Sequence, residues 1–306
     1  MTASTPPQLV VFGDIPSELR RALEPAYELV GRTSLPSGPA PGFDIAVTTS
    51  VTGLDATQMA ALPDLKLIAC NGAGLENIDV AEANRRGVVV RNTPDAVTTD
   101  TADFALALIF AISRRLVEGD RFIRAGQWTS ARMPPSVRVR GKRLGIVGFG
   151  KIGSTVADRA AALGLTVAYN ARSAKPGLPY GFVQSVGDLA QDSDYLVLAC
   201  PGGAETRHLV NAEILRRLGP KGYLINISRG SVVDEAALLA ALQDKTIAGA
   251  ALDVFENEPA IDPAFFALQN VVLTPHLAAV TQETRADIAE HLRSGIAAFL
   301  EAKKTA

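Results

Sequence analysis

The sequence predicts an α/β protein made of two doubly wound domains, each built on a parallel sheet. Short runs rich in Val, Ile and Leu alternate with longer helix-like segments along nearly the whole chain. This alternation is typical of βαβ units, whose strands are buried on both faces and are therefore apolar throughout. A break around residues 126–141 divides the chain into two such series, and 306 residues suit two domains of ordinary size.

The first series of elements occupies roughly the first third of the chain. We expect strands at residues 9–12, 27–30, 45–48, 65–69 and 88–90, where apolar and β-branched residues run together. Helix-like patterns lie between these runs, among them residues 17–24 and 80–86.

A long helix is predicted next, over residues 101–119. Ala, Leu and Ile occur nearly all round it, which is typical of a helix buried between layers, between domains or at a subunit contact. Residues 126–141, which include Pro134 and Pro135, then predict an irregular excursion or linker.

The second series of elements begins at Arg143. Its expected strands are residues 144–147, 166–169, 195–198, 223–227, 248–253 and 271–273. A final helix over residues 281–300 carries apolar residues at helical spacing.

The composition narrows the functional classes. The chain is 47% hydrophobic and has a formal net charge of -2 with a pI near 6.0. This balance disfavours a nucleic-acid binder, which needs a basic face, and gives no sign of a membrane-surface protein. The cluster Arg138, Arg140, Lys142 and Arg143 is therefore interpreted as a solvated face.

Cysteine use and the lack of targeting signals indicate a cytoplasmic protein. Cys70 and Cys200 are far apart, and no CxxC or Cys/His cluster is present, so buried reduced thiols are expected and neither a disulfide nor a zinc site is. Residues 1–7 lack the basic start and apolar core of a secretory signal and are interpreted as a frayed tail. The apolar stretch of residues 105–112 is too short to span a membrane.

A glycine-rich turn predicts a dinucleotide site. Residues 148–153 read Gly148-Phe149-Gly150-Lys151-Ile152-Gly153 and lie between a strand and a helix. In this context the first glycine permits the tight turn, the second lets the backbone approach a pyrophosphate, and the third lets helix and strand pack closely. The pyrophosphate would then rest on the helix N-terminus.

The end of the next strand favours NADP over NAD. An NAD site usually has an acidic residue here to bind the ribose 2′-hydroxyl. This chain instead has Asn170, Arg172 and Ser173, with Lys175 close by. Because an arginine forms charge-assisted hydrogen bonds with a phosphate, Arg172 is expected to bind the 2′-phosphate, with NAD(H) as a weaker alternative.

Other polar groups follow strands at the edge where open α/β sheets bind ligands. His276 follows the strand at residues 271–273, and Arg229 follows the strand at residues 223–227. Glu256 and Glu258 both follow the strand at residues 248–253, and their spacing does not rank one above the other. Of the other two histidines, His208 is expected to be exposed and His291 to lie on a helix face.

Together these segments resemble the D-isomer-specific 2-hydroxyacid dehydrogenase family over essentially the whole chain. The resemblance is closest to the branch of NADPH-dependent glyoxylate/hydroxypyruvate and hydroxyphenylpyruvate reductases. The motifs that carry it are residues 71–79, 92–94, 148–153, 200–206, 226–230, 253–259 and 274–276.

The resemblance implies a role for each matching residue. His276 would be the proton donor, Glu258 its partner and Arg229 the substrate clamp, since a carboxylate favours the imidazolium and an arginine stabilises a developing oxyanion. The backbone at Ala73, Gly74 and Leu75 would bind the substrate carboxylate. Asp253 would lie near the nicotinamide carboxamide, and Cys200, Pro201, Thr206, Ile227 and Ser228 would line the cofactor site.

The family also implies the domain organisation. A discontinuous, flavodoxin-like substrate domain would comprise residues 1–98 and 285–306, and a Rossmann-like cofactor domain would comprise residues 99–284. The active-site cleft would lie between them, and a homodimer would form through the cofactor domains.

Two departures from the family pattern bear on the substrate and cofactor. Some hydroxypyruvate reductases have a second tryptophan shortly after the position of Trp128, where this chain has Ala131-Arg132-Met133, so larger 2-oxo acids remain open beside glyoxylate and hydroxypyruvate. The loop Gly202-Gly203-Ala204 is richer in glycine than usual. The alternative reading is a non-catalytic NAD(P)-sensing protein of the corepressor type.

Overall fold

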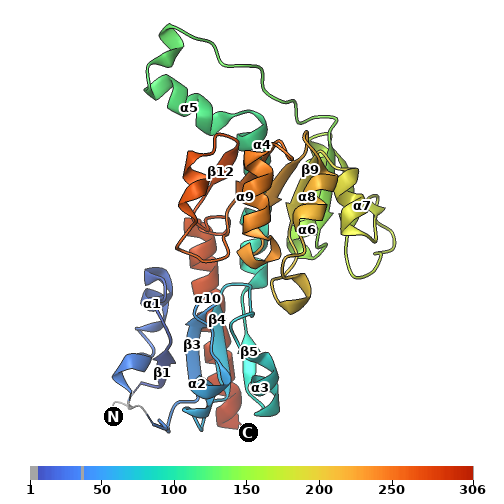
Figure 1. The fold of residues 1–306 in the computed structure, drawn as a ribbon. Coiled ribbons are helices and arrows are strands. Elements are labelled where there is room, and N and C mark those ends of the chain that lie inside the picture. The colour runs from blue at the N-terminus through green and yellow to red at the C-terminus, as the bar shows by residue number, and fades with distance from the viewer. Residues whose placement is uncertain (1–5, 36–37, 306) are drawn as a thin grey trace. The chain divides into compact units, whose positions relative to one another are not determined.

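The computed structural model describes residues 6–35 and 38–305, and it confirms two α/β units with all-parallel sheets (Figure 1). The outer unit consists of the described residues up to Val97 together with those from Val280 onward. The inserted unit is Thr98–Ala279. Residues 1–5, most of the predicted N-terminal tail, lie outside the described residues.

The outer unit contains a five-stranded sheet in the order β2-β1-β3-β4-β5. Its strands are β1 (Gln8–Val11), β2 (Glu28–Gly31), β3 (Ile45–Thr49), β4 (Leu67–Asn71) and β5 (Val89–Arg91). The helices are α1 (Ser17–Leu23), α2 (Ala56–Ala60), α3 (Val80–Arg85) and α10 (Gln282–Thr305), and α10 packs against β4 and α1. The short helix α2 was not predicted, although Asp55 and Gln58 form a capping box at its start.

The inserted unit contains a seven-stranded sheet in the order β12-β11-β10-β9-β6-β7-β8. Its strands are β6 (Arg143–Val147), β7 (Thr166–Asn170), β8 (Gly181–Phe182), β9 (Tyr195–Leu198), β10 (Tyr223–Asn226), β11 (Gly249–Leu252) and β12 (Val271–Leu273). Two separate cores cover its faces. One joins the sheet to α6 (Lys151–Ala162) and to the helix α4 (Pro94–Ser113), and the other joins it to α7 (Val186–Gln191), α8 (Ala212–Leu218) and α9 (Glu235–Gln243).

The long predicted helix is in fact two helices. α4 begins at Pro94, seven residues before the predicted start, and ends at Ser113; α5 covers Leu116–Arg124. Arg115 between them has a left-handed backbone (φ 56°), a conformation that no helix interior contains. Apolar periodicity alone could not show this break, because the residues on both sides are helix formers.

The burial predicted for this helix is confirmed for α4. Its length and composition would suffice to cross a membrane, but Ala102, Ala105 and Ile109 are completely buried in a core of the inserted unit. None of the α5 residues is buried.

The predicted excursion is an arm that begins with α5 and returns through residues 130–142, as Figure 1 shows. Its apolar side chains Leu116, Ile123 and Trp128 are 58%, 52% and 60% exposed. Met133 folds back on α5, with its sulfur near Gly119.

Candidate active site

The order of the inserted sheet places a ligand crevice at the carboxyl ends of β6 and β9. From β6 the chain runs outward to β7 and β8 and then returns to β9 on the other side of β6, so the order reverses between β6 and β9. Open α/β sheets bind ligands at such a reversal. Gly148 follows β6 and Cys200 follows β9, and a Cβ at Gly148 would lie 2.4 Å from the Cys200 backbone nitrogen. Only glycine, here at φ 91°, allows the two loops to meet so closely.

The three glycines of the turn have different surroundings. A Cβ at Gly153 would lie 2.1 Å from the Gly148 carbonyl oxygen, so this glycine allows α6 to pack against the turn. A Cβ at Gly150 would meet nothing within 4 Å. Because α6 begins after Gly150 without a side-chain cap, its first N–H groups are directed at this open space. A phosphate group fits both features.

The loop after β7 is held by aromatic side chains. The ring of Phe149 stacks on Tyr169 with centroids 4.0 Å apart, and the Tyr169 hydroxyl accepts the Lys175 N–H at 2.8 Å. The Lys175 ammonium lies 5.8 Å from the centre of the Phe149 ring, beside the glycine-rich turn. Arg172 and Ser173 are exposed on this loop.

Asn170 has a different environment from that expected of a cofactor ligand. Its side-chain amide donates hydrogen bonds to the carbonyls of Val183 at 3.0 Å and Gln184 at 2.8 Å. Both side-chain N–H groups therefore stabilise the chain after β8, and only the side-chain oxygen of Asn170 remains for a ligand.

The remaining predicted cofactor residues shape the loops after β9 and β10. The Ser228 hydroxyl donates to the Cys200 carbonyl, and the Thr206 hydroxyl donates to the Pro201 carbonyl at 2.8 Å. Ile227 is buried. Burial raises the pKa of the Cys200 thiol, which keeps it protonated and unreactive.

His276 and Glu258 form a hydrogen-bonded pair. His276 Nδ1 lies 2.8 Å from Glu258 Oε2, and Glu258 Oε1 accepts the Phe255 N–H at 2.8 Å. Burial acts to raise the pKa of Glu258, but the hydrogen bonds from His276 and Phe255, together with the positive charge of Arg229, outweigh it and lower that pKa. Since Nδ1 faces Glu258, His276 Nε2 is left for a substrate.

Asp253 fixes the turn that carries His276. The Asp253 side chain is completely buried and accepts hydrogen bonds from Thr274 Oγ1 at 2.6 Å, Leu277 N–H at 2.8 Å and Ala278 N–H at 2.9 Å. This turn gives His276 a left-handed backbone (φ 54°), which costs energy in a non-glycine residue. Asp253 thus holds the turn around His276 through contacts that the sequence did not suggest.

Arg229 belongs to the same edge of the sheet. It follows β10, and its guanidinium donates to the Ser228 carbonyl at 2.8 Å. A Cβ on the next residue, Gly230, would lie 1.9 Å from the Phe255 carbonyl carbon, so this loop packs directly on the turn after β11. Arg229, Glu258 and His276 therefore follow three neighbouring strands, β10, β11 and β12.

The structure also separates the two glutamates that the sequence could not rank. Glu256 does not contact His276; its carboxylate binds Arg207 at 2.7 Å and His208 at 3.0 Å. His208, which was expected to be exposed, is thus paired and only partly exposed, whereas His291 lies on a face of α10 as predicted. Glu256 therefore forms an ion-pair cluster with the loop after β9, and no sequence motif indicated this cluster.

In the outer unit, the loop at residues 72–75 presents its backbone N–H groups. The Asn92 amide donates to the Ala73 carbonyl at 2.6 Å, and Gly72 exchanges hydrogen bonds with Thr93. Within the described parts of the chain, the N–H groups of Ala73, Gly74 and Leu75 have no acceptor. Consecutive N–H groups of this kind form a concave site for an anion such as a carboxylate.

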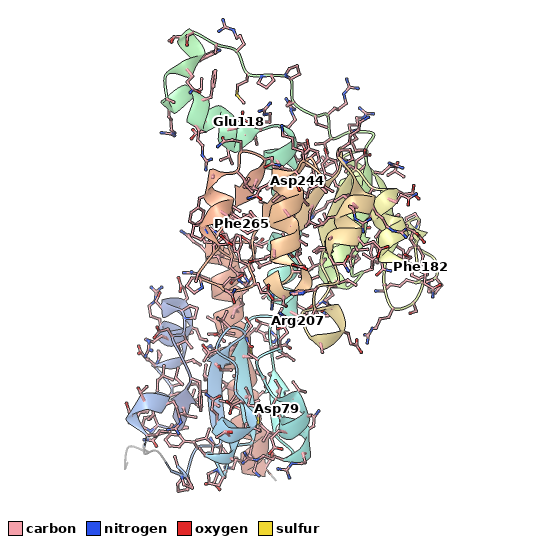
Figure 2. All side chains as sticks on the ribbon, in the orientation of Figure 1. Asp79, Glu118, Phe182, Arg207, Asp244 and Phe265 are labelled. Carbon is pink, nitrogen blue, oxygen red and sulfur yellow. The ribbon has the colours of Figure 1, made fainter. Side chains whose placement is uncertain are left out.

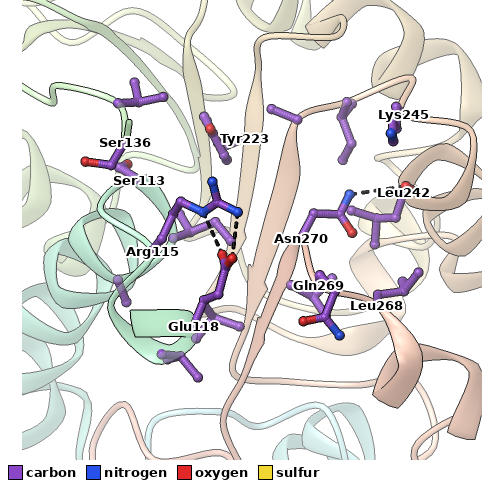
Figure 3. A pocket seen from close by; sticks show the side chains of 18 of the residues that line it. Ser113, Arg115, Glu118, Ser136, Tyr223, Leu242, Lys245, Leu268, Gln269 and Asn270 are labelled. Atoms are coloured by element: carbon purple, nitrogen blue, oxygen red, sulfur yellow. Dashed lines mark hydrogen bonds and ion pairs between the residues drawn. The ribbon is translucent and has the colours of Figure 1, made fainter. Parts of the chain in front are cut away.

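A separate cavity lies at the opposite edge of the inserted sheet, below the arm (Figure 3). Its volume is about 660 Å³. The lining includes the first residues of β10 and β12 and the Arg115–Glu118 ion pair at 2.6 Å. Because the predicted site residues follow the strands rather than precede them, this cavity is distinct from the candidate active site.

The described acidic, histidine and cysteine side chains do not gather into a metal site. Within residues 6–35 and 38–305, no group of three or more of them could hold a metal ion.

Comparison with known proteins gives the family. Residues 106–278 match the family model for the NAD binding domain of D-isomer specific 2-hydroxyacid dehydrogenases. The chain is 43% identical over 257 residues to hydroxyphenylpyruvate reductase of Plectranthus scutellarioides, covering 84% of this chain and 82% of that protein. It is 40% identical over 302 residues to 2-ketogluconate reductase of Gluconobacter oxydans, covering 98% and 97%.

Among solved structures, the chain is similar to an NADPH-dependent glyoxylate/hydroxypyruvate reductase of Sinorhizobium meliloti, crystallised with NADP and malonate. The TM-score is 0.91 at 36% identity, and the match covers 97% of this chain and 94% of that one.

Proposed function

Because this chain belongs to the D-isomer-specific 2-hydroxyacid dehydrogenase family, we propose that it reduces a small 2-oxo acid to the D-2-hydroxy acid with NADPH. The single observation that carries the proposal is the His276–Glu258 pair, at 2.8 Å, with Arg229 on the adjacent strand end. A proton donor and a cation at the ligand-binding edge of a nucleotide-binding sheet are what the reduction of a ketone requires.

The residues present fit a dinucleotide. The open space at Gly150, the uncapped start of α6 and the close contact of Gly148 with Cys200 form a cradle for a pyrophosphate. NADPH bound there supplies the hydride that the protein itself cannot provide.

The side chains then bind and polarise the substrate. The Arg229 guanidinium stabilises the negative charge that develops on the carbonyl oxygen, and His276 Nε2 donates the proton to that oxygen. Glu258 holds the His276 ring through Nδ1, and Asp253 holds the turn below it. The N–H groups of Ala73, Gly74 and Leu75 are suited to the substrate carboxylate.

We assign the preference for NADPH to Arg172 and Ser173. Both are exposed on the loop after β7, with Lys175 held beside them over Phe149. No carboxylate follows β7 to bind a ribose 2′-hydroxyl or repel a 2′-phosphate. The similarity to an NADPH-dependent reductase of Sinorhizobium meliloti supports the preference for NADPH itself.

The proposed substrates are glyoxylate, hydroxypyruvate and hydroxyphenylpyruvate. The relatives named for these acids support all three, and the 2-ketogluconate reductase adds a sugar acid. Ala131, Arg132 and Met133 stand where some hydroxypyruvate reductases have a tryptophan, which leaves room for a larger acid.

Initial rates of cofactor oxidation test the function. We expect turnover with NADPH against at least one of glyoxylate, hydroxypyruvate, hydroxyphenylpyruvate and 2-ketogluconate. His276→Asn should lower kcat about 100- to 10,000-fold, because general acid catalysis contributes that much. His291→Asn is the control, since His291 is exposed on α10. Binding of NADPH without turnover of any of the four acids would contradict the proposal.

We further propose a homodimer through the inserted unit, with the arm as the contact. The exposed Leu116, Ile123 and Trp128 on the arm provide apolar surface for a second copy, and the cavity at the base of the arm has a mixed polar and apolar lining. A twofold axis would let each arm use the partner's surface.

A further inference from the structure

Glu256 is the centre of an ion-pair cluster next to the candidate active site. Glu256 Oε1 lies 2.7 Å from Arg207 Nη2 and 3.0 Å from His208 Nε2, and both partners come from the loop after β9. The Glu256 N–H donates to Glu235 Oε1, at the start of α9, at 2.6 Å. Figure 2 labels Arg207 at this edge of the inserted unit and Asp244 at the other end of α9.

The cluster is assembled at an energetic cost. His208 has a left-handed backbone (φ 51°), which is uncommon for residues other than glycine, and its N–H donates to the Ser231 carbonyl at 2.8 Å. Glu235 is half-buried, and its pKa is raised: burial is the main cause, the charges of Glu256, Asp262 and Glu258 add to it, and the hydrogen bond from the Glu256 N–H opposes it. Strained backbone and crowded carboxylates persist only where the surrounding contacts hold them in place.

The same cluster reaches the catalytic pair through the backbone. Glu256 precedes Glu258 by two residues, and the intervening turn is closed by the Phe255 N–H donating to Glu258 Oε1. Gly230, next to Arg229, packs on the backbone of Phe255 and Glu256 with no room for a Cβ. Glu256 therefore connects the loops after β9, β10 and β11.

An ordinary surface ion pair would not have this form. The Arg217–Glu213 pair, for example, joins residues four apart on α8, and its glutamate side chain is 59% exposed. The Glu256 side chain is only 22% exposed, and it bridges segments almost fifty residues apart. Less exposed carboxylates with two hydrogen-bonding partners hold geometry more firmly than exposed helical pairs.

From these contacts we propose that Glu256 is a positioning residue for the proposed reduction, which ties the loop after β9 to the turn that presents Glu258 to His276. Arg207 and His208 hold the Glu256 side chain, and Glu235 holds its backbone N–H. The turn between Glu256 and Glu258 then has one conformation, in which Glu258 Oε2 meets His276 Nδ1. This inference rests on the proposed function only for its catalytic consequence.

Three variants test the proposal: Glu256→Gln, which keeps the size and loses the charge; Glu256→Ala, which removes all side-chain contacts; and Glu213→Gln as the control. We expect Glu256→Gln to lower kcat about tenfold and Glu256→Ala up to about 100-fold, since small displacements of catalytic groups have such effects. The KM for NADPH should change less than kcat, because Glu256 binds Arg207 and His208 and not the proposed cofactor residues before them. Glu213→Gln should behave as wild type.

The pH profile separates geometry from charge. The lowered pKa of Glu258 depends first on its hydrogen bond with His276. Loosening the turn should therefore move the acidic limb of kcat to higher pH. Removing the charge of Glu256 would by itself move that limb to lower pH. An upward shift is the outcome that supports positioning.

A measurement without turnover distinguishes this proposal from the proposed function. The chain has three histidines, so the imidazole ¹⁵N shifts of His276 can be resolved from those of His208 and His291. We expect Glu256→Gln to change the His276 Nδ1 shift and to leave His291 unchanged. If the wild type reduced no 2-oxo acid, the proposed function would be wrong. The ¹⁵N shift of His276 would still show whether Glu256 positions the His276–Glu258 pair.

Two results would overturn the proposal. One is a His276 spectrum and a kcat that match wild type in Glu256→Gln. The other is a loss of activity that follows a lower Tm alone, with kcat per folded enzyme unchanged, which would make the cluster merely structural. Should Glu256→Ala fail to fold, Glu256→Gln carries both readouts.

Discussion

At the scale of single residues, two carboxyl groups of the candidate active site differ in what they bind. Asp253 is completely buried and satisfied by three donors from the turn around His276. Glu258 is 29% exposed and binds the imidazole itself. Asp253 holds the backbone of the turn, and Glu258 orients the imidazole ring of His276. Substitution of the two residues should therefore have different effects.

Replacement of Asp253 by Asn should therefore act through the turn. Asn keeps one acceptor oxygen but puts an NH2 group opposite a backbone N–H, which leaves buried donors unpaired at a cost of about 1–3 kcal/mol. We expect a Tm lower by roughly 2–10 °C together with a reduced kcat. Scanning calorimetry and initial rates would check this; a variant as stable as wild type would show that the turn holds without Asp253.

The lowered pKa of Glu258 links stability to pH. Its carboxyl has a lower pKa in the folded protein than the ordinary value of 4.5, so its contribution to the free energy of unfolding is present above pH 4.5 and is lost as pH falls through the folded value. Glu258→Gln should cost about 1 kcal/mol or more at pH 7. Urea unfolding of wild type and variant should show that difference shrinking below pH 4.5; a difference independent of pH would contradict the linkage.

Cofactor preference is also a residue-scale property. Arg172→Ala should raise the KM for NADPH about tenfold or more and leave NADH kinetics nearly unchanged, because a hydrogen bond to a charged group contributes about 1.5–3 kcal/mol. Arg216→Ala, an exposed arginine on α8, is the control. Equal losses with both cofactors would place the 2′-phosphate elsewhere.

At this scale the sequence pointed to residues that the structure brings to one edge of the inserted sheet, but it did not show their partners. His276 and Arg229 could be chosen because each follows a strand at the ligand-binding edge. Glu256 and Glu258 follow the same strand two residues apart, so only the path of the turn decides which one meets His276. That path depends on contacts with Gly230 and Glu235, which lie far away in sequence.

At the scale of elements, two glycines of the glycine-rich turn have different roles: Gly148 is needed for packing, and Gly150 is expected to be needed for binding. We expect Gly148→Ala to destabilise the fold, because its Cβ would lie 2.4 Å from the Cys200 backbone at φ 91°. We expect Gly150→Ala to leave the Tm nearly unchanged, since the space around it is open, and to weaken NADPH binding. Calorimetry and fluorescence titration would test the contrast. Unchanged NADPH affinity in Gly150→Ala would move the pyrophosphate away from this turn.

The elements that the sequence predicted well are those buried on both faces. β9, β10 and β11 have almost no exposed residues, so their apolar runs read directly as strands. The two-residue strand β8 and the five-residue helix α2 were missed, because neither is long enough to show a period. The end of α4 at Ser113 was missed because Arg115, whose backbone breaks the helix, is an ordinary helix former in sequence.

At the scale of the whole molecule, the boundaries between the two units could not be predicted from the periodicity of apolar residues. The units separate after Val97 and after Ala279, and the second point lies five residues before the boundary expected from the family. The start of α10 belongs to the outer unit, since Thr284 Oγ1 donates to the Ala96 carbonyl at 3.4 Å. Helical spacing identified α10, but its packing against β4 and α1 is a tertiary contact.

Assembly is the prediction that belongs to this scale. We expect a particle of twice the 32.1 kDa chain mass by light scattering. Leu116→Asp combined with Ile123→Asp should yield monomers, because charges on the exposed apolar face of α5 would oppose its burial. Leu178→Asp, an exposed apolar residue on the loop before β8, is the control. A wild-type monomer would refute the proposed dimer.

The packing of α10 against β4 also sets an order of events at the ribosome. The five strands of the outer unit are synthesised first, yet the helix that covers β4 follows the whole inserted unit in the chain. During translation the inserted unit can complete its sheet while the outer sheet still lacks the buried side chains of Ile288, Leu292 and Ile296. The outer unit therefore begins synthesis first and completes its fold last. Until α10 is made, one face of its sheet is uncovered and is a target for a chaperone.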